Sequence, residues 1–348
     1  MTTPVAVLGA GNWGTTLAHL IASNGRRVLL FTRDRTQCDE INRDRTNRRA
    51  GLDLHISPGV RAVSDLAEAV SDAELLLIAI PSQSFRDVCR AAAGVLRPEH
   101  LVIHCAKGVE METHRRMSEV LLEETCVRQI GVLAGPNIAS EIAQGKPAGT
   151  TIASSFPRVV DAGRSALSSD RFMVFAGTDV LGVELCGALK NVIAIAAGMA
   201  DEMKVGENAK AFLVTRGVAE LTRLAFAMGA QPATMTGLAG LGDVMVTCAS
   251  PLSRNHRVGA ALARGESLDQ MLAQLGMVAE GVYASRAAHE LAEEHGITMP
   301  LFEHVERVLR HELSPRGALD ALMSLAPGHD VPRLKPTPKR NPRRGPFG

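Results

Sequence analysis

The chain has 348 residues, more than one hydrophobic core comfortably supports, so we expect two domains. Its 46% hydrophobic and 22% charged residues are typical of a soluble globular protein, and a net charge of +1 gives no support for nucleic-acid binding. The six cysteines lack metal-ligand spacing and no secretory leader precedes Val5, so we expect no metal site and a location in the cytoplasm.

The first predicted strand, residues 5–8, runs into a glycine-rich turn and then a helix over residues 15–23. A second strand is predicted at residues 28–31. In this context GxGxxG spacing indicates a dinucleotide site, with the pyrophosphate at the helix N-terminus. The glycines permit the tight turn, the close approach of the phosphates and the packing of helix on strand. We expect cofactor contacts from Gly9, Gly11, Gly14 and the tryptophan between them, Trp13.

Arg33 follows the second strand, where an acidic residue would bind the ribose hydroxyls of NAD. A guanidinium at this point suits the 2′-phosphate of NADP, so the sequence slightly favours NADP. Asp34 keeps NAD possible. The alternative interpretation is that the arginines here are solvated side chains at the start of a helix.

Further strands are predicted at residues 75–80, 101–104, 130–133, 150–153 and 172–175, with helical segments between several of them. This order predicts an α/β fold, a Rossmann-type doubly wound parallel sheet over residues 1–178. Ligands of such sheets bind at the carboxyl ends of the strands. Lys107 and the loop from Gly135 to Asn137 both fall on that edge.

Residues 179–200 predict a long helix that is buried on nearly every side. Glu184, Lys190 and Asn191 interrupt its apolar sequence and make insertion into a membrane expensive. Small residues share the face of Lys190, so this lysine faces a potential cleft. Burial would lower its pKa toward the range of proton exchange. Alternatively, its side chain extends to an acid at the surface.

The second half is predicted to be helical, with segments at residues 208–228, 254–264, 268–275, 282–295 and 301–311. We expect an all-helical domain over residues 179–326. Residues 327–348 form a basic tail rich in proline and arginine, which we expect to be disordered. Weak attraction of this tail to anionic lipid is the alternative to a simple solvated tail.

Two loops of the helical half carry candidate chemistry. A glycine-rich turn places Asp243 beside apolar residues, although an aspartate that caps a helix would also fit there. The next helix opens with Ser253, Arg254 and Asn255, and the helix macrodipole disfavours cations at that end. This mismatch suggests a bound anion such as a phosphate, held by backbone N–H groups and these side chains.

The motifs GAGNWGTTLA, CAKG, GPN, GALKNVIAIAAGM, GLAGLGD and SRNHR occur in this order between Val5 and Leu325. Together they closely resemble the bacterial-type NAD(P)-dependent glycerol-3-phosphate dehydrogenases. The resemblance implies a homodimer that interconverts dihydroxyacetone phosphate and sn-glycerol 3-phosphate, the backbone of glycerophospholipids. It also implies that Lys190 donates and accepts the proton, with Lys107 and Asp243 beside it.

The resemblance further implies the residues that bind each ligand. The substrate contacts fall on Lys107, Gly135, Asn137, Lys190, Asp243, Ser253, Arg254 and Asn255. The cofactor contacts fall on Asn12, Trp13, Arg33, Lys107, Ala139, Arg254, Val278 and Glu280. One position departs from the family, which usually has Ser or Thr where this chain has Asn137. An amide both donates and accepts hydrogen bonds, so a contact to substrate can survive there.

The chemistry of the residues agrees with the resemblance. Hydride transfer to a ketone leaves charge growing on the carbonyl oxygen, which a nearby ammonium can neutralise by giving a proton. Lys107 would lower the pKa of Lys190 further, and Asp243 would oppose that shift. Two alternatives remain. A hydroxy-acid dehydrogenase leaves the anion site at residues 253–255 unexplained, and a non-catalytic NAD(P)-sensing regulator leaves the three charged residues unexplained.

Overall fold

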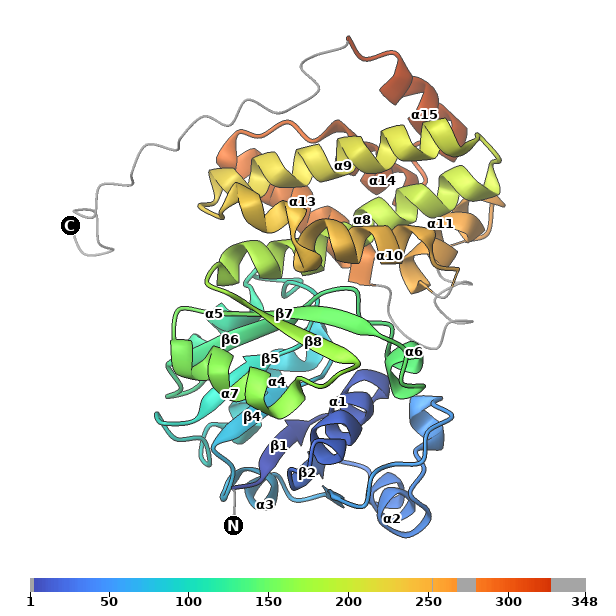
Figure 1. Ribbon diagram of the computed structural model, residues 1–348. Helices are drawn as coiled ribbons and strands as arrows, with labels where there is room; N and C mark the ends of the chain where they lie inside the picture. Colours follow the sequence, from blue (N-terminus) through green and yellow to red (C-terminus); the bar gives the residue numbers. More distant parts are fainter. Residues whose placement is uncertain (1–2, 252, 268–279, 327–348) are drawn as a thin grey trace, which may run out of the picture.

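The apolar segments of the first half form one open sheet, and the second half forms a bundle of helices stacked on it (Figure 1). The computed structural model describes residues 3–251, 253–267 and 280–326. The helix expected at residues 268–275, the candidate contact Val278 and the tail at residues 327–348 lie outside these ranges. The strands are β1 (Val5–Leu8), β2 (Val28–Phe31), β3 (Val60–Val63), β4 (Leu75–Ile78), β5 (Leu101–His104), β6 (Gln129–Ala134), β7 (Ala148–Ser154) and β8 (Phe172–Gly177).

The strand order β3-β2-β1-β4-β5-β6-β7-β8 is doubly wound, as expected. The first strand pairs in parallel with β2 and with β4, in the registers Val5↔Val28 and Val5↔Leu75. The order reverses between β1 and β4, so a crevice for ligands opens beyond the carboxyl ends of these two strands. The glycine-rich turn begins there, directly after Leu8.

One pair of strands contradicts the expectation of a purely parallel sheet, because β7 runs antiparallel to β6. Between them lies only a short connection with the five-residue helix α6 (Ala139–Ala143). A parallel neighbour requires a crossover, usually a helix, that carries the chain back along the whole strand, and a five-residue helix is too short to do so. The following crossover restores parallel pairing between β7 and β8.

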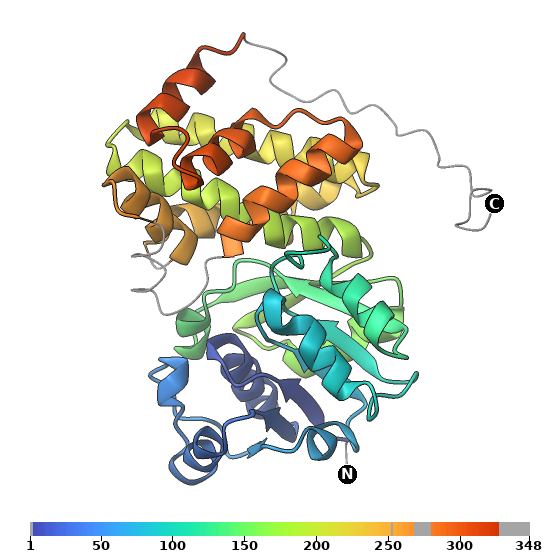
Figure 2. The same ribbon diagram turned by 180° about the vertical axis from the view of Figure 1, so that it is seen from behind.

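Alternate residues of each strand face two separate apolar layers, which explains why the strands are continuously apolar. Val5 and Val7 belong to the layer under α1 (Asn12–Ser23), α2 (Arg35–Asp44), α6 and α7 (Pro157–Leu167). Ala6 and Leu8 belong to the opposite layer, under α3 (Leu66–Val70), α4 (Phe85–Ala92) and α5 (Met117–Glu124). Figure 2 shows this second face, with α4 and α5 in front.

The long apolar segment forms α8 (Val180–Glu202), which starts just after the last strand and is buried along most of its length, as expected. It packs against α9 (Glu207–Ala227), α10 (Asp243–Ala249), α11 (Arg254–Ala263) and α13 (Glu280–His295). The bundle is completed by α14 (Pro300–Leu309) and α15 (Pro315–Met323). Among the described residues, α8 is long and apolar enough to cross a membrane, but 89% of its most apolar window is buried inside the protein.

The short elements that were not predicted include β3, α10 and α15. Strand β3 carries an exposed arginine among three apolar residues, which weakens its apolar signal. Helix α10 starts inside the glycine-rich turn, after a π-helical turn over Leu238–Gly242, so its first residue looked like part of a loop. Its N-cap is Gly242 with no side-chain cap, so Asp243 does not cap the helix, and that alternative interpretation is wrong.

Candidate active site

The glycine-rich turn has the geometry that a dinucleotide requires. Gly9 has a φ of +109°, and a Cβ on it would lie 2.6 Å from the Ala79 carbonyl oxygen at the end of β4. A Cβ on Gly14 would lie 1.9 Å from the Gly9 oxygen, so helix and turn touch. A Cβ on Gly11 would meet nothing within 4 Å, and α1 starts there with no side-chain cap. The uncapped N–H groups and the open space fit a pyrophosphate.

A buried polar network that sequence reasoning missed holds this turn in place. The Ala10 carbonyl accepts hydrogen bonds from Gln37 Nε2 at 2.8 Å and from Asn47 Nδ2 at 2.9 Å. Asn47 also donates to Thr15 Oγ1 at 2.8 Å. The turn is therefore tied to α2 and to the loop behind it. Gln37 and Asn47 belong to no sequence motif, so the sequence did not indicate this network.

The end of β2 presents Arg33 as an exposed side chain. The neighbouring Asp34 is engaged elsewhere, because it caps α2 by accepting from the N–H groups of Thr36 and Gln37. Its second oxygen accepts from Arg49 Nη1 at 2.7 Å. A carboxylate with both oxygens occupied is a poor partner for ribose hydroxyls, whereas the guanidinium of Arg33 remains exposed.

Lys190 lies buried on α8 and does not extend to the surface, so the alternative of a surface ion pair is wrong. Its Nζ donates to Asp243 Oδ1 at 2.5 Å and to Thr247 Oγ1 at 2.6 Å. The Thr247 hydroxyl donates to the backbone oxygen of Asp243 at 2.6 Å and is therefore the acceptor for the lysine. An ammonium has three N–H bonds. Among the described residues, one of them remains for a substrate oxygen.

Lys107 approaches the same carboxylate from the sheet. It follows β5, and its Nζ donates to Asp243 Oδ2 at 2.7 Å and to the Gly135 carbonyl at 3.0 Å. The structure thus brings Lys190, Lys107 and Asp243 together at the boundary between sheet and bundle. Two cations and one carboxylate leave a positive charge that suits a phosphate ester.

Asp243 and Lys190 alter each other's pKa. Burial alone would raise the pKa of Asp243, but Lys107 and Lys190 outweigh it and lower that pKa. Burial lowers the pKa of Lys190 to about 8, against the opposing charge of Asp243 and with the help of Lys107. A pKa near neutrality lets this lysine give and take a proton at physiological pH.

The candidate anion residues lie next to Lys190 because α11 packs in backbone contact with α8. A Cβ on Gly259 would lie 2.0 Å from the Ile195 oxygen, so only glycine permits this approach. Asn255 Nδ2 then donates to Asn191 Oδ1 at 2.8 Å. Ser253 caps α11 by accepting from the His256 N–H, which places Arg254 in the first turn. Sequence reasoning assigned no site role to Asn191 or Thr247, although both contact site residues.

Glu280 begins α13 and crosses to the sheet. Its Oε2 accepts from Ser82 Oγ at 2.6 Å, and a Cβ on Gly108 would lie 2.7 Å from the same oxygen. Burial raises the pKa of Glu280, and the hydroxyl and N–H of Ser82 oppose this rise. Glu280 therefore lies beside the residue after Lys107. Its predicted contact with the cofactor stays a prediction.

The loop after β6 forms one wall of the same region. Gly135 accepts from Lys107, as described, and has a φ of +158°. Asn137 Nδ2 donates to Thr150 Oγ1 at 3.0 Å, and its Oδ1 is buried without a partner among the described residues. Ala139 opens α6, where its carbonyl oxygen lies 3.5 Å from Thr16 Oγ1 of α1. This places Ala139 beside the helix that follows the glycine-rich turn.

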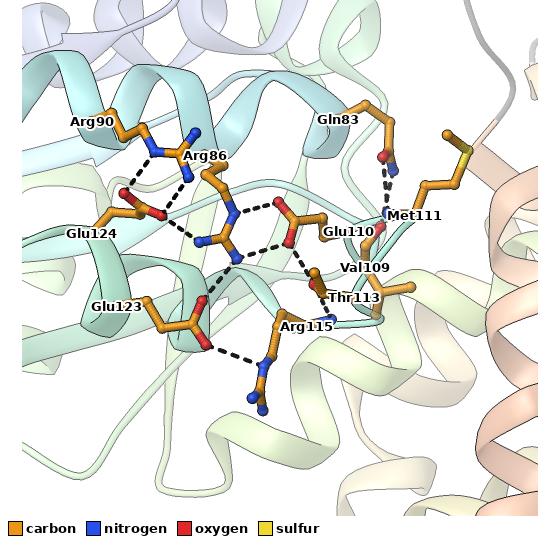
Figure 3. A network of polar contacts seen from close by, with 10 residues as sticks. All are labelled: Gln83, Arg86, Arg90, Val109, Glu110, Met111, Thr113, Arg115, Glu123 and Glu124. Carbon is orange, nitrogen blue, oxygen red and sulfur yellow. Dashed lines mark hydrogen bonds and ion pairs between the residues drawn. The ribbon is translucent and has the colours of Figure 1, made fainter.

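A charged network anchors the loop that carries Lys107 (Figure 3). Arg86 of α4 donates to both oxygens of Glu110, at 2.7 and 2.8 Å, and also binds Glu123 and Glu124 of α5. Its side chain is 18% exposed, so solvent screens these pairs only in part. Glu110, three residues after Lys107, is therefore tied to α4 and α5, two helices that cover the sheet.

A second network fixes the start of α8. Glu184 is buried and accepts from the N–H and the hydroxyl of Ser118, each at 2.8 Å, and from Arg116. His104 Nε2, at the end of β5, lies 3.0 Å from its Oε1. Burial alone would raise the pKa of Glu184, but these partners lower it to about 2. A buried ionised carboxylate thus joins the helix of Lys190 to the strand before Lys107.

Comparisons with known proteins agree with this geometry. Residues 4–159 match the family described as NAD-dependent glycerol-3-phosphate dehydrogenase N-terminus, and residues 179–320 match its C-terminus. A glycerol-3-phosphate dehydrogenase [NAD(P)+] from an Exiguobacterium species is 42% identical over 95% of this chain and 98% of its own length. A second such enzyme, from a Parafrankia species, is 45% identical over 93% of this chain and 97% of its own length.

Solved structures agree as well. The glycerol-3-phosphate dehydrogenase of Coxiella burnetii has a TM-score of 0.88 at 35% identity, covering 93% of this chain and 99% of its own. A D-mandelate dehydrogenase with a TM-score of 0.59 at 12% identity, covering 92% and 99% of the two chains, shares the fold alone. With both family regions matched and relatives above 40% identity along nearly the whole chain, this protein belongs to the NAD-dependent glycerol-3-phosphate dehydrogenase family.

Proposed function

We propose that this chain reduces dihydroxyacetone phosphate to sn-glycerol 3-phosphate with NADPH or NADH, reversibly, and that Lys190 gives the proton. The observation that carries the proposal is the buried Lys190 ammonium, bound to Asp243 and Thr247 with one N–H remaining among the described residues. The family supplies the reaction, and this geometry supplies a proton donor for it.

Each residue has a distinct task in the proposed reaction. The bound nicotinamide supplies the hydride that reduces C2 of the substrate. Lys190 gives the proton of its third N–H, the one not bound to Asp243 or Thr247, to the C2 oxygen as negative charge develops there. This converts the carbonyl to a hydroxyl. Asp243 holds the ammonium in place, and Lys107 adds a second positive charge beside the reacting oxygen. Arg254, Asn255 and the N-terminus of α11 bind the phosphate, with Ser253 beside them.

The direct test is an assay of the purified chain with NADPH and dihydroxyacetone phosphate. We expect loss of NADPH absorbance only when this ketone is added, with the NADPH consumed equal to the glycerol 3-phosphate formed. Pyruvate is the control, because it is a ketone without a phosphate group. No turnover with dihydroxyacetone phosphate would contradict the proposed reaction and favour an NAD(P)-sensing regulator. Preferential turnover of pyruvate would favour a hydroxy-acid dehydrogenase.

The pH dependence of the rate follows from the lysine. Reduction requires the protonated form, so kcat/KM for dihydroxyacetone phosphate should be constant below the Lys190 pKa of about 8 and fall tenfold per pH unit above it. Oxidation of glycerol 3-phosphate requires the neutral amine and should rise through the same pH. Initial rates from about pH 6 to about pH 10 measure both profiles. A flat reduction profile would contradict the role of Lys190 as the proton donor.

The cofactor site fits either cofactor, and we propose a slight preference for NADP. The support is that Asp34 is occupied by the helix cap and by Arg49, while Arg33 is exposed. Replacing Arg33 with alanine should raise KM for NADPH about 10-fold or more, because a charge-assisted hydrogen bond is lost. KM for NADH should change little. Arg43→Ala, at the other end of α2, is the matched control, and equal effects on NADPH and NADH would contradict the proposal.

We further propose that the protein is a cytoplasmic homodimer that supplies the backbone of glycerophospholipids. The support for this proposal is the family to which the chain belongs. We also propose a domain division at residues 178 and 179. The separate apolar layers of the sheet and the separate core around α8 support this division.

A further inference from the structure

We infer that Gln83 is a positioning residue for Lys107, clamping the loop that follows this lysine through its side-chain amide. The inference rests on the proposed function, because it concerns how Lys107 is held beside Asp243. Gln83 lies in the short 3-10 helix Ser82–Ser84 directly before α4, on the sheet side of the site, and belongs to none of the motifs of the sequence.

The amide binds two backbone groups of one loop. Gln83 Nε2 donates to the Val109 carbonyl at 2.9 Å, and Gln83 Oε1 accepts from the Met111 N–H at 3.0 Å (Figure 3). One contact needs a donor and the other an acceptor, so the orientation of the amide is fixed. Val109 is two residues after Lys107. Gly108, between them, has no free space, since a Cβ there would lie 2.6 Å from Ser82 Oγ.

The same amide is linked to the helical bundle. Gln83 Nε2 lies 3.1 Å from Ser82 Oγ, which in turn donates to Glu280 Oε2 at 2.6 Å. Glu280 is the first residue of α13. A chain of hydrogen bonds therefore runs from the bundle, through Ser82 and Gln83, to the loop of Lys107. The loop is held from the sheet and from the bundle at once.

The clamp complements the charged network described above. Within this loop, Arg86 binds the side chain of Glu110, by two hydrogen bonds, and among the described residues it makes no hydrogen bond with the loop backbone. Gln83 holds the backbone on either side of Glu110. Without Gln83, the loop keeps the side-chain anchor of Glu110 and its backbone hydrogen bond to the Arg115 carbonyl, at 2.9 Å, but loses the contacts that tie its backbone to the turn before α4. A small shift is sufficient to matter, because reacting groups displaced by about 1 Å lose much of their effect.

The consequence is measurable at Lys190. The charged or titratable groups that act on its ammonium are Asp243, Lys107 and Cys248, and Lys107 lowers its pKa. If Lys107 moves away, that lowering effect weakens while Asp243 continues to raise the pKa. The pH above which reduction declines should therefore move upward. A loss of folded protein alone lowers the rate equally at every pH and does not move this point.

The test uses the full-length chain and the variant Gln83→Met, which keeps the length of the side chain and removes both backbone contacts. We expect kcat for dihydroxyacetone phosphate to fall about 10-fold and the falling limb of the pH profile to move up by about half a unit or more. Arg90→Ala is the matched control, because Arg90 binds Glu124 on the outer side of the network. That control should leave both quantities unchanged.

Thermal unfolding of each variant shows whether it is folded before the rates are compared. If Gln83→Met does not fold, Gln83→Asn carries the same test, since the shorter amide cannot span both backbone groups. A folded variant with the wild-type pH profile, or with a uniform loss of rate at every pH, overturns the inference. A wild-type chain that does not reduce dihydroxyacetone phosphate contradicts the proposed function, and with it this inference.

Discussion

Replacing Lys190 with alanine should lower kcat for the reduction of dihydroxyacetone phosphate by about 10³-fold or more, while NADPH still binds. The substitution removes the proposed proton donor, which is also one of the two lysines that bind Asp243. Lys107 keeps its contacts with Asp243 and Gly135, so the carboxylate is not left unpaired. Steady-state rates together with NADPH fluorescence titration separate the loss of chemistry from a loss of cofactor binding.

The matched control for this substitution is Lys146→Ala. Lys146 is an exposed lysine whose partner in the structure is Glu141, at 3.3 Å. It should leave kcat unchanged, because exposed ion pairs contribute little and this one lies outside the site. Turnover of Lys190→Ala within a few-fold of wild type would contradict the assigned proton donor. Loss of NADPH binding in that variant would contradict the separation of chemistry from cofactor binding.

Replacing Glu184 with alanine should destabilise the protein by about 3 kcal/mol, because Arg116 then loses a buried partner. Ser118 also loses the acceptor of its N–H and hydroxyl groups. Such a loss is a large share of a typical stability of about 5–15 kcal/mol. Urea unfolding followed by circular dichroism measures it as a lower midpoint. Glu141→Ala is the control, because that exposed carboxylate should cost less than about 1 kcal/mol.

The pH dependence of the same contribution has a defined sign. The pKa of Glu184 is lowered to about 2 in the folded protein from an ordinary 4.5. Its contribution to stability is therefore fully present above about pH 4.5 and is lost as the pH falls toward 2. The stability difference between wild type and Glu184→Ala should shrink over this range. A difference that stays constant from neutral pH to pH 2 would contradict the ionised pair.

The sequence allowed most of the sheet to be predicted, because apolar runs followed by glycine turns leave few alternatives. Three predicted strands have the observed bounds, β1, β2 and β5. The antiparallel direction of β7 was not predicted, because a strand has the same composition whichever way it runs. Helix α10 was missed because Asp243 follows three glycines within a turn, and a π-helical turn has no sequence signal comparable to an N-cap.

For the site, sequence motifs indicated the charged residues but not the hydrogen bonds that join them. Lys190, Lys107 and Asp243 are far apart in the chain, and only the packing of α8 against α10 and the sheet brings them to one carboxylate. Thr247, Asn191 and Gln83 could not be predicted from single residues. Their roles depend on which backbone or side-chain atom lies opposite them, and the folding of distant segments decides that.

The most direct measurement is a crystal structure of the chain with NADP and glycerol 3-phosphate bound together. The proposed function predicts Lys190 Nζ within hydrogen-bond distance of the C2 oxygen, about 2.7–3.2 Å, with the phosphate at Arg254 and Asn255. A C2 oxygen more than about 4 Å from Nζ, with another proton donor beside it, would contradict the central role of Lys190.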